Sequence, residues 1–246
     1  GGLYQFDGYD LTEYRSNVYN FNLLTHNRIT CLKEDEQKNL YIGTNEGLNI
    51  LNKKTGHIIK SKHPQFSRNY IASITQTAEG EIWVGTNNGL YNYCLEKDSC
   101  HKILDKTIKG MLVDSKQNIW IGTYSGTLSY VNVNENHAFR TYHTQNSGLN
   151  YAPVSAFAEE QDYIWIGTEG GGINRMDKVN GEISGFTLPN NVTSKNVKSL
   201  VIDAGRNLWI STFRGGLDLY DSRQNKAINY KHSKKDSCSL LVDDIR

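Results

Sequence analysis

The sequence lacks the features of several protein classes. It has no run of about 20 apolar residues, the length a membrane-spanning helix needs, and Gly1-Gly2-Leu3-Tyr4 shows no signal-peptide character. Lys and Arg number 27 against 26 Asp and Glu, so a net charge of +1 gives no field that would attract nucleic acid or an anionic membrane. We therefore expect neither nucleic acid binding nor direct membrane insertion of this segment.

Proline and cysteine are also scarce. There are 3 Pro against 22 Gly, which favours many tight turns and few rigid linkers. The 4 cysteines form no C-x-x-C pair, and no histidine stands at the spacing of a metal ligand. We expect no metal site and no cofactor.

What the chain does have is a repeat. An apolar-aromatic-apolar run is followed by Gly-Thr or Ser-Thr, a short polar turn and then Gly-Leu, Gly-Ile or Thr-Leu, as in residues 118–128. The small residue before the threonine is Gly43, Gly85, Gly122, Gly167 or Ser211, a mean step of 42 residues. A period in that range predicts a solenoid, a propeller or an array, and a hairpin in every unit favours the propeller.

Each repeat contains four expected strands, here named A to D in chain order. The tryptophan run is strand B and the run after the turn is strand C. A run with small residues such as Gly110 and Ala156 precedes them as strand A, and a more polar run follows as strand D. Four antiparallel strands per unit of about 40 residues make a propeller blade.

The fold class is therefore an all-β propeller of four-stranded antiparallel blades. We expect five complete blades and a partial blade at each end, so the chain is a segment of a larger propeller. The complete blades are residues 27–66, 67–104, 105–143, 152–188 and 196–232, and the partial blades are 1–15 and 243–246.

The repeated core resembles the two-component-regulator propeller repeat. Tyr41 replaces the tryptophan in the first copy and Ser211 replaces the glycine in the last. The resemblance implies a seven-bladed propeller in the periplasm, ahead of a β-sandwich domain, a membrane helix and a histidine kinase. It also implies a sensor domain for an oligosaccharide, with neighbouring propeller and β-sandwich domains as partners and a homodimer as a further expectation.

Two other functions compete with sensing. A protein-docking scaffold would use the faces and edges of the same propeller, since fold does not fix function. A propeller glycosidase or lyase would need convergent acid and base groups, and no such pair stands out, so we expect no catalytic residue in this segment. We interpret the recurring acids Asp35, Asp114, Glu159 and Asp203 as caps of the A–B turns, and the tryptophans as packing between blades.

A ligand is expected where B–C turns and D-to-A connections emerge on one face. Tyr124, Phe213 and Arg214 are the main candidates, because bulky groups at turn tips gain little by packing but can stack on a sugar or pair with an acid. The same turns and connections supply further candidates: Asn45, Tyr70, Asn87, Tyr151 and Glu169. Exposed aromatics without any partner are the alternative interpretation.

One disulfide is a further expectation. Cys94 and Cys100 flank a short connection between strands C and D, and opposed residues of an antiparallel pair have Cα atoms about 4.5–5.5 Å apart, which a disulfide accepts. A periplasmic setting would permit the bond. Two free thiols in a misaligned register are the alternative.

Overall fold

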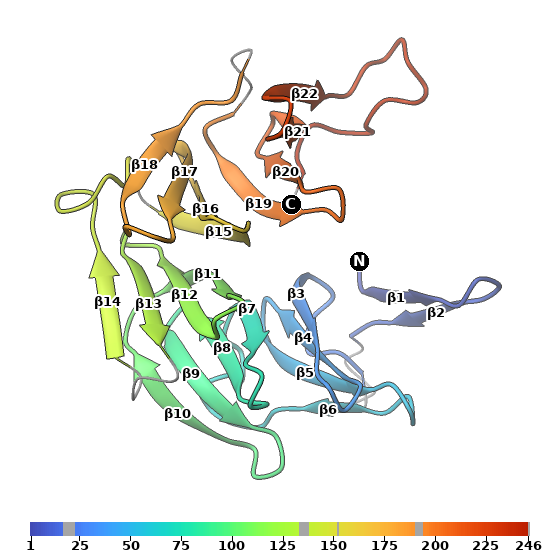
Figure 1. Cartoon of the computed structure of the whole chain (residues 1–246). Coiled ribbons are helices and arrows are strands. Elements are labelled where there is room, and N and C mark those ends of the chain that lie inside the picture. Colours follow the sequence, from blue (N-terminus) through green and yellow to red (C-terminus); the bar gives the residue numbers. More distant parts are fainter. Residues whose placement is uncertain (17–22, 133–137, 152, 190–193, 246) are drawn as a thin grey trace. The chain divides into compact units, whose positions relative to one another are not determined.

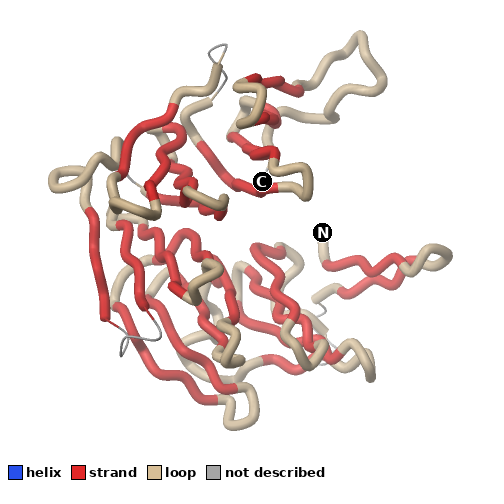
Figure 2. Tube along the Cα trace, viewed as in Figure 1, coloured by secondary structure: helices blue, strands red, loops and turns tan. Residues whose placement is uncertain are grey.

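The computed structural model describes residues 1–246 except 17–22, 133–137, 152, 190–193 and 246. Figure 2 shows strands joined by loops and turns over this part of the chain. No helix occurs among the described residues, so none there has the length and apolar character to cross a membrane.

The described strands form five four-stranded sheets and one hairpin (Figure 1). In each sheet, every strand is hydrogen-bonded to the strand that precedes or follows it in the chain, so the order is A-B-C-D. The prediction of five complete four-stranded antiparallel blades is confirmed. We number these blades 1 to 5 in chain order.

The chain divides into two compact units, residues 1–109 and 110–246. In the first unit, the hairpin consists of β1 (Leu3–Phe6) and β2 (Leu11–Tyr14). Blade 1 consists of β3 (Ile29–Glu34), β4 (Asn39–Thr44), β5 (Gly47–Asn52) and β6 (Ile58–Lys60). Blade 2 consists of β7 (Ile71–Gln76), β8 (Ile82–Thr86), β9 (Gly89–Cys94) and β10 (Ser99–Leu104).

The second unit holds the other three blades. Blade 3 consists of β11 (Ile108–Val113), which begins at the boundary, β12 (Asn118–Thr123), β13 (Leu128–Asn132) and β14 (Ala138–Tyr142). Blade 4 consists of β15 (Val154–Glu159), β16 (Tyr163–Thr168), β17 (Gly172–Asp177) and β18 (Ile183–Phe186). Blade 5 consists of β19 (Val197–Ile202), β20 (Asn207–Thr212), β21 (Gly216–Asp221) and β22 (Lys226–Tyr230).

The apolar cores lie between neighbouring blades of a unit. In the second unit, Trp120 packs with Ile164, Ile166 and Met176 between blades 3 and 4. Trp165 packs with side chains of blade 5 such as Tyr220. The strand B ring therefore faces the next blade at these two positions, which confirms the interpretation of Trp120 and Trp165 as packing between blades.

Strand A is the place of closest approach between blades. A Cβ atom on Gly122 would stand 2.5 Å from the carbonyl oxygen of Val154, and one on Gly110 would collide with the carbonyl oxygen of Ser155. The Ser155 hydroxyl donates to the carbonyl of Val197, at 2.8 Å. Small residues in strands A and B therefore permit backbone and hydroxyl contacts that larger side chains would block.

The A–B turns are capped by aspartate in three blades. In blade 3, Asp114 Oδ1 accepts the backbone N–H of Asn118 at 2.8 Å, while its Oδ2 accepts the side-chain amide of Asn118 and the indole N–H of Trp120, each at 2.8 Å. Asp203 accepts the corresponding bonds from Asn207 and Trp209 in blade 5. Asp35 caps Asn39 in blade 1.

The prediction is wrong for Glu159. Its carboxylate does not cap the A–B turn of its own blade. It accepts bonds from the backbone N–H and the hydroxyl of Ser115 in the A–B turn of blade 3, at 2.7 and 2.6 Å, and from the ammonium of Lys178 at 2.6 Å. The indole N–H of Trp165 goes to the next residue, Glu160, at 2.8 Å. Glu159 lies at the end of strand A, so its longer side chain reaches the neighbouring blade.

The predicted disulfide is also wrong. The register of β9 and β10 pairs Cys94 with Ser99 and Cys100 with Tyr93, and both cysteines are free thiols. Successive residues of a strand point to opposite faces, so this one-residue offset places the two thiols on opposite sides of the sheet. Cys100 lies instead beside His63, with Sγ 3.2 Å from Nδ1.

The chain end expected to open another strand A is not a strand among the described residues up to 245. It nevertheless joins blade 5, because the carbonyl of Asp243 accepts the N–H of Gly216 at 2.9 Å and the N–H of Ile245 donates to the carbonyl of Thr212 at 3.4 Å.

Removal of the blade 3 cap should destabilise the protein. We expect Asp114→Ala to lower the free energy of unfolding by about 2–4 kcal/mol, because the Trp120 indole and the Asn118 amides lose their acceptor in a buried place. Chemical denaturation followed by circular dichroism measures the change. Glu79→Ala, at an exposed site in the blade 2 turn, is the control and should change stability by less than about 0.5 kcal/mol. A loss below about 1 kcal/mol for Asp114→Ala would contradict the assigned role.

The cap of blade 5 should contribute a pH dependence. Hydrogen bonds from the side chain and backbone of Asn207 and from Trp209 lower the pKa of Asp203 from 3.8 to about 2. A depressed folded-state pKa gives stability that is present above the unfolded pKa and is lost as the pH falls. We expect Asp203→Asn to be less stable than the wild type near pH 6, with a difference that shrinks between about pH 4 and pH 2. Urea denaturation over this range tests it, and a constant difference would refute the assignment.

Candidate functional site

A threonine hydroxyl fixes the B–C turn in every blade. The hydroxyl of Thr168 donates to the carbonyl of Gly172 at 2.9 Å and accepts the N–H of Gly171 at 3.1 Å. Equivalent bonds to the far side of the turn are made by the other four, which are Thr44, Thr86, Thr123 and Thr212. All five threonines are at most 1% exposed, so the turn is held from below while its tip projects from the strands.

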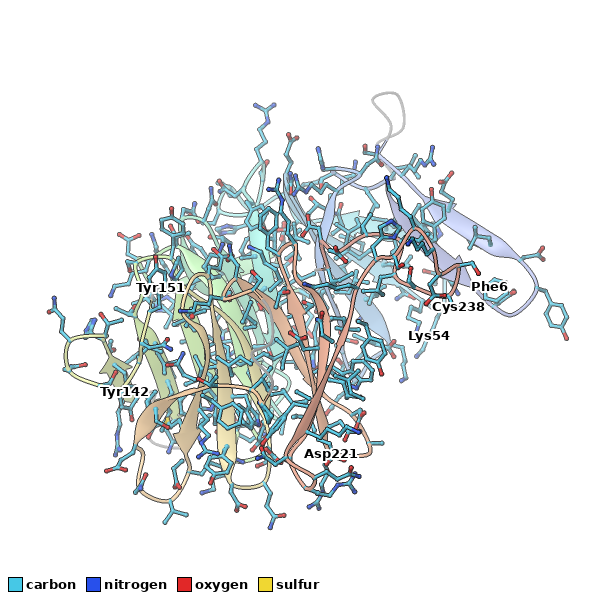
Figure 3. All side chains as sticks on the ribbon, turned by 90° about the horizontal axis from the view of Figure 1, so that it is seen from above. Phe6, Lys54, Tyr142, Tyr151, Asp221 and Cys238 are labelled. Atoms are coloured by element: carbon cyan, nitrogen blue, oxygen red, sulfur yellow. The ribbon has the colours of Figure 1, made fainter. Side chains whose placement is uncertain are left out.

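The turn tips lie against the connections that lead into strand A. Backbone N–H groups of Glu169 and Phe213 donate to the carbonyls of Pro153 and Asn196, both at 2.9 Å. In the first unit, Asn45 and Asn87 make the corresponding bonds to Arg28 and Tyr70, at 3.1 and 3.2 Å. We call this end of a blade its B–C face. Figure 3 shows Tyr151 toward this end of the second unit and Asp221, at the end of a strand C, toward the other.

Four side chains meet on the B–C face of blades 4 and 5. Lys198 forms an ion pair with Glu169, with Nζ 2.8 Å from Oε1, and both side chains are largely buried. The same ammonium lies 5.7 Å from the ring centroid of Phe213, and the Arg214 guanidinium lies 4.9 Å from it. We call Glu169, Lys198, Phe213 and Arg214 the Phe213 cluster.

The cluster offers an aromatic ring, two cations and a carboxylate. Arg214 is exposed and occupies the left-handed region with φ 57°, so its backbone directs the side chain away from the strand. Its guanidinium rests on Phe213 rather than on an acid. A planar guanidinium held on a ring can take a carboxylate or hydroxyl groups of a ligand while the ring packs against apolar C–H groups.

Tyr151 lies beside the cluster on the turn of blade 4. A Cβ atom on Gly170, which has φ 135°, or on Gly171 would collide with the Tyr151 side chain, so the ring occupies the space that two glycines leave open. The tyrosine is 47% exposed. Its outer surface therefore extends the aromatic area next to Glu169.

The predicted residues divide between the two units. Glu169, Phe213 and Arg214 meet in the second unit, with Tyr151 next to them. Tyr124 is 63% exposed and lies on the blade 3 turn. Asn45, Asn87 and the 42% exposed Tyr70 belong to the first unit.

Sequence reasoning missed Lys198. It is the second residue of strand A, where the register of β19 with β20 shifts. The same place in blades 1, 2 and 4 holds Thr30, Ala72 and Ser155, and it is a register shift there too. Blade 3 has Lys109 at the equivalent place, so the alignment of repeats did not single out Lys198, whose ion pair with Glu169 is seen only in the structure.

Among the described residues, no three or more His, Cys, Asp or Glu side chains gather as metal ligands would. Glu34 on the first unit has its pKa lowered to about 2 by hydrogen bonds from Lys53 and Lys38, a surface network away from any B–C turn.

The sequence profile of the two-component regulator propeller matches three segments, residues 23–46, 65–88 and 102–125. Each segment contains one tryptophan or tyrosine run with its Gly-Thr turn. Three repeats of the chain therefore match that propeller repeat.

The chain spans only part of two larger proteins to which it is similar. It is 25% identical over 189 residues to histidine kinase P4 of Formosa agariphila, an alignment that covers 69% of this chain and 14% of the kinase. The extracellular domain of a putative hybrid two component system from B. thetaiotaomicron superposes with a TM-score of 0.78 at 22% identity, over 99% of this chain and 32% of that one. Virginiamycin B lyase from Staphylococcus aureus superposes with a TM-score of 0.69 at 18% identity, over 90% of this chain and 73% of the lyase.

Glycine at position 170 should prove necessary for the B–C turn of blade 4. We expect Gly170→Ala to destabilise the protein more than Gly181→Ala, by at least about 1 kcal/mol, because Gly181 at φ 76° has open space around it whereas Gly170 also meets Tyr151. Thermal and urea unfolding of the two variants measure the difference. Equal losses would show that the ring does not depend on this glycine.

Proposed function

We propose that this chain is part of the ligand-sensing, extracytoplasmic region of a two-component signalling protein. Its ligand is an oligosaccharide, and binding is relayed to a histidine kinase outside this segment. The three matched repeats and the similarity to a histidine kinase support the signalling role. A periplasmic location and contacts with other propeller and β-sandwich domains, or with a second copy, belong to the same proposal.

The Phe213 cluster is the observation that carries the ligand part of the proposal. Sugars present hydroxyl groups around their edge and C–H groups on their faces, which call for charged or amide partners beside an aromatic surface. The cluster supplies Arg214 and the Glu169–Lys198 pair as polar partners and the rings of Phe213 and Tyr151 as apolar ones. Glu169, Phe213 and Arg214 sit on turns that the threonine bonds hold in place, so little order has to be gained there on binding.

Alanine at Phe213 and Arg214 together should abolish oligosaccharide binding. Isothermal titration calorimetry with a panel of neutral oligosaccharides released from polysaccharides measures this, and the melting temperature should stay nearly unchanged because both side chains project from a turn. The matched control is Val201→Ala with Arg206→Ala, an exposed apolar residue and an exposed arginine of the same blade, which should bind as the wild type does. Undiminished affinity in the Phe213/Arg214 variant would remove this face, and no binding of any panel member by the wild type would remove the ligand class.

A lyase is the competing function, because virginiamycin B lyase shares the fold. We propose that this segment does not catalyse a reaction: the one carboxylate of the cluster, Glu169, is paired with Lys198. Release of shortened or unsaturated products from a bound oligosaccharide would favour the lyase instead. A protein-docking scaffold would retain partner binding and show no heat with any sugar.

A further inference from the structure

A second polar pocket lies at the other end of the second unit. It has a volume of about 350 Å³ and runs between blade 3 and the C–D turn of blade 4. A–B and C–D turns stand at the opposite ends of the strands from B–C turns, so this groove is separate from the Phe213 cluster. We call it the blade 3–4 groove.

One wall of the groove is a row of planar groups. Trp120, Tyr130 and Arg140 stand opposite one another on strands B, C and D of blade 3. The rings of Trp120 and Tyr130 stack at 5.1 Å with an interplanar angle of 24°, and the Arg140 guanidinium lies 5.7 Å from the Tyr130 centroid. The guanidinium is therefore positioned by the sheet and by the ring, while its side chain stays exposed.

The charges that line the groove are mainly positive. Lys116, Arg140 and Lys178 contribute three cations, and Asp114 contributes one carboxylate. Asp114 is already occupied by the cap of the A–B turn, and Lys178 by Glu159. Lys116 and Arg140 form no ion pair with any described residue, and both side chains are exposed, so two cations at the groove are without a described carboxylate partner.

The two walls are tied together below these cations. Glu159 accepts bonds from Ser115 in the blade 3 turn and from Lys178 in the blade 4 turn. Burial alone would raise the pKa of Glu159. The hydrogen bonds from Lys178 and Ser115 outweigh that effect and lower the pKa, which favours the charged carboxylate. The groove is thus held at a fixed width before any ligand enters.

The groove continues into a larger pocket of about 560 Å³, which shares Tyr142, Asn180 and Gly181 with it. That pocket adds Arg175, whose guanidinium lies 4.7 Å from the Tyr163 ring centroid, together with the carboxylates of Asp177 and Glu182, so the excess of cations is confined to the blade 3–4 groove. Pockets of about 300–1,000 Å³ accept small organic ligands, and two that adjoin have room for more than one sugar unit.

We propose that the blade 3–4 groove binds an acidic saccharide, whose anionic group pairs with Arg140 and Lys116. The planar fork of the guanidinium matches a carboxylate or a sulfate ester, and Lys116 adds a second, mobile cation. The side-chain amides of Asn118 and Asn180 and the hydroxyl groups of the lining tyrosines can form hydrogen bonds with the sugar hydroxyls. This site is additional to the Phe213 cluster and does not depend on it.

The test is calorimetry on the whole 246-residue chain with two matched ligand pairs. Trigalacturonate is compared with its neutral methyl ester, and sulfated lactose with lactose. We expect at least one anionic ligand to bind roughly tenfold or more tightly than its neutral counterpart, with an affinity that falls as salt is added. The pair that shows the preference identifies carboxylate or sulfate as the recognised group.

Two variants assign the binding to the groove. Lys116→Gln with Arg140→Gln should remove the preference for the anionic ligand and leave the melting temperature unchanged, because both side chains are exposed. Arg223→Gln, an exposed arginine on the C–D turn of blade 5, should keep it. Phe213→Ala with Arg214→Ala should keep it as well, which separates this site from the proposed sensing face. An equal affinity for the charged and neutral ligands, no binding of either anion, or a preference that survives the groove variant would overturn the proposal.

Discussion

The threonine bond beneath each B–C turn is the interaction on which the rest of the structure depends. A buried hydroxyl must find both a donor and an acceptor, and here both come from the turn's own backbone. The bond holds the two ends of the turn, so the residues at the tip can differ between blades, as Phe213 and Arg214 do in blade 5 and Tyr124 does in blade 3. The turn sets the register of strands B and C, and in blades 3 and 4 the tryptophan of strand B packs against the next blade.

The structural features that recur in every blade were predictable from the sequence because the same residue pattern occurs in each repeat. The number and order of strands, the inward ring of strand B and the aspartate caps follow from a common pattern that five copies make unambiguous. The face on which turns and connections gather follows from strand direction alone. Asn45 and Asn87 were placed correctly on that face. The repeat does not predict which residues of that face lie close together in three dimensions.

Features that occur once were the ones that sequence reasoning missed or placed wrongly. The Cys94–Cys100 prediction failed by a single step of register, which hydrophobic pattern does not fix in an outer, half-exposed strand pair. Glu159 departs from its repeat because it is the last residue of strand A, and the next residue, Glu160, takes the place of the capping aspartates and accepts the indole N–H of Trp165. Lys198 and Arg140 become candidate site residues only through their contacts with Glu169 and Tyr130. These partners are 29 and 10 residues away in the chain, so the sequence alone did not reveal the contacts.

The aspartate caps also bear on how the chain folds. Each joins groups that are four to six residues apart, as in Asp114 with Asn118 and Trp120. Closing so short a loop takes a fraction of a microsecond, on the order of 10–100 ns for about ten residues. These hairpins can therefore form during synthesis, each on its own segment, before a neighbouring blade exists to receive the tryptophan. Assembly of the apolar cores between blades is then the slower step. Its rate depends on how fast hairpins that have already formed dock against one another.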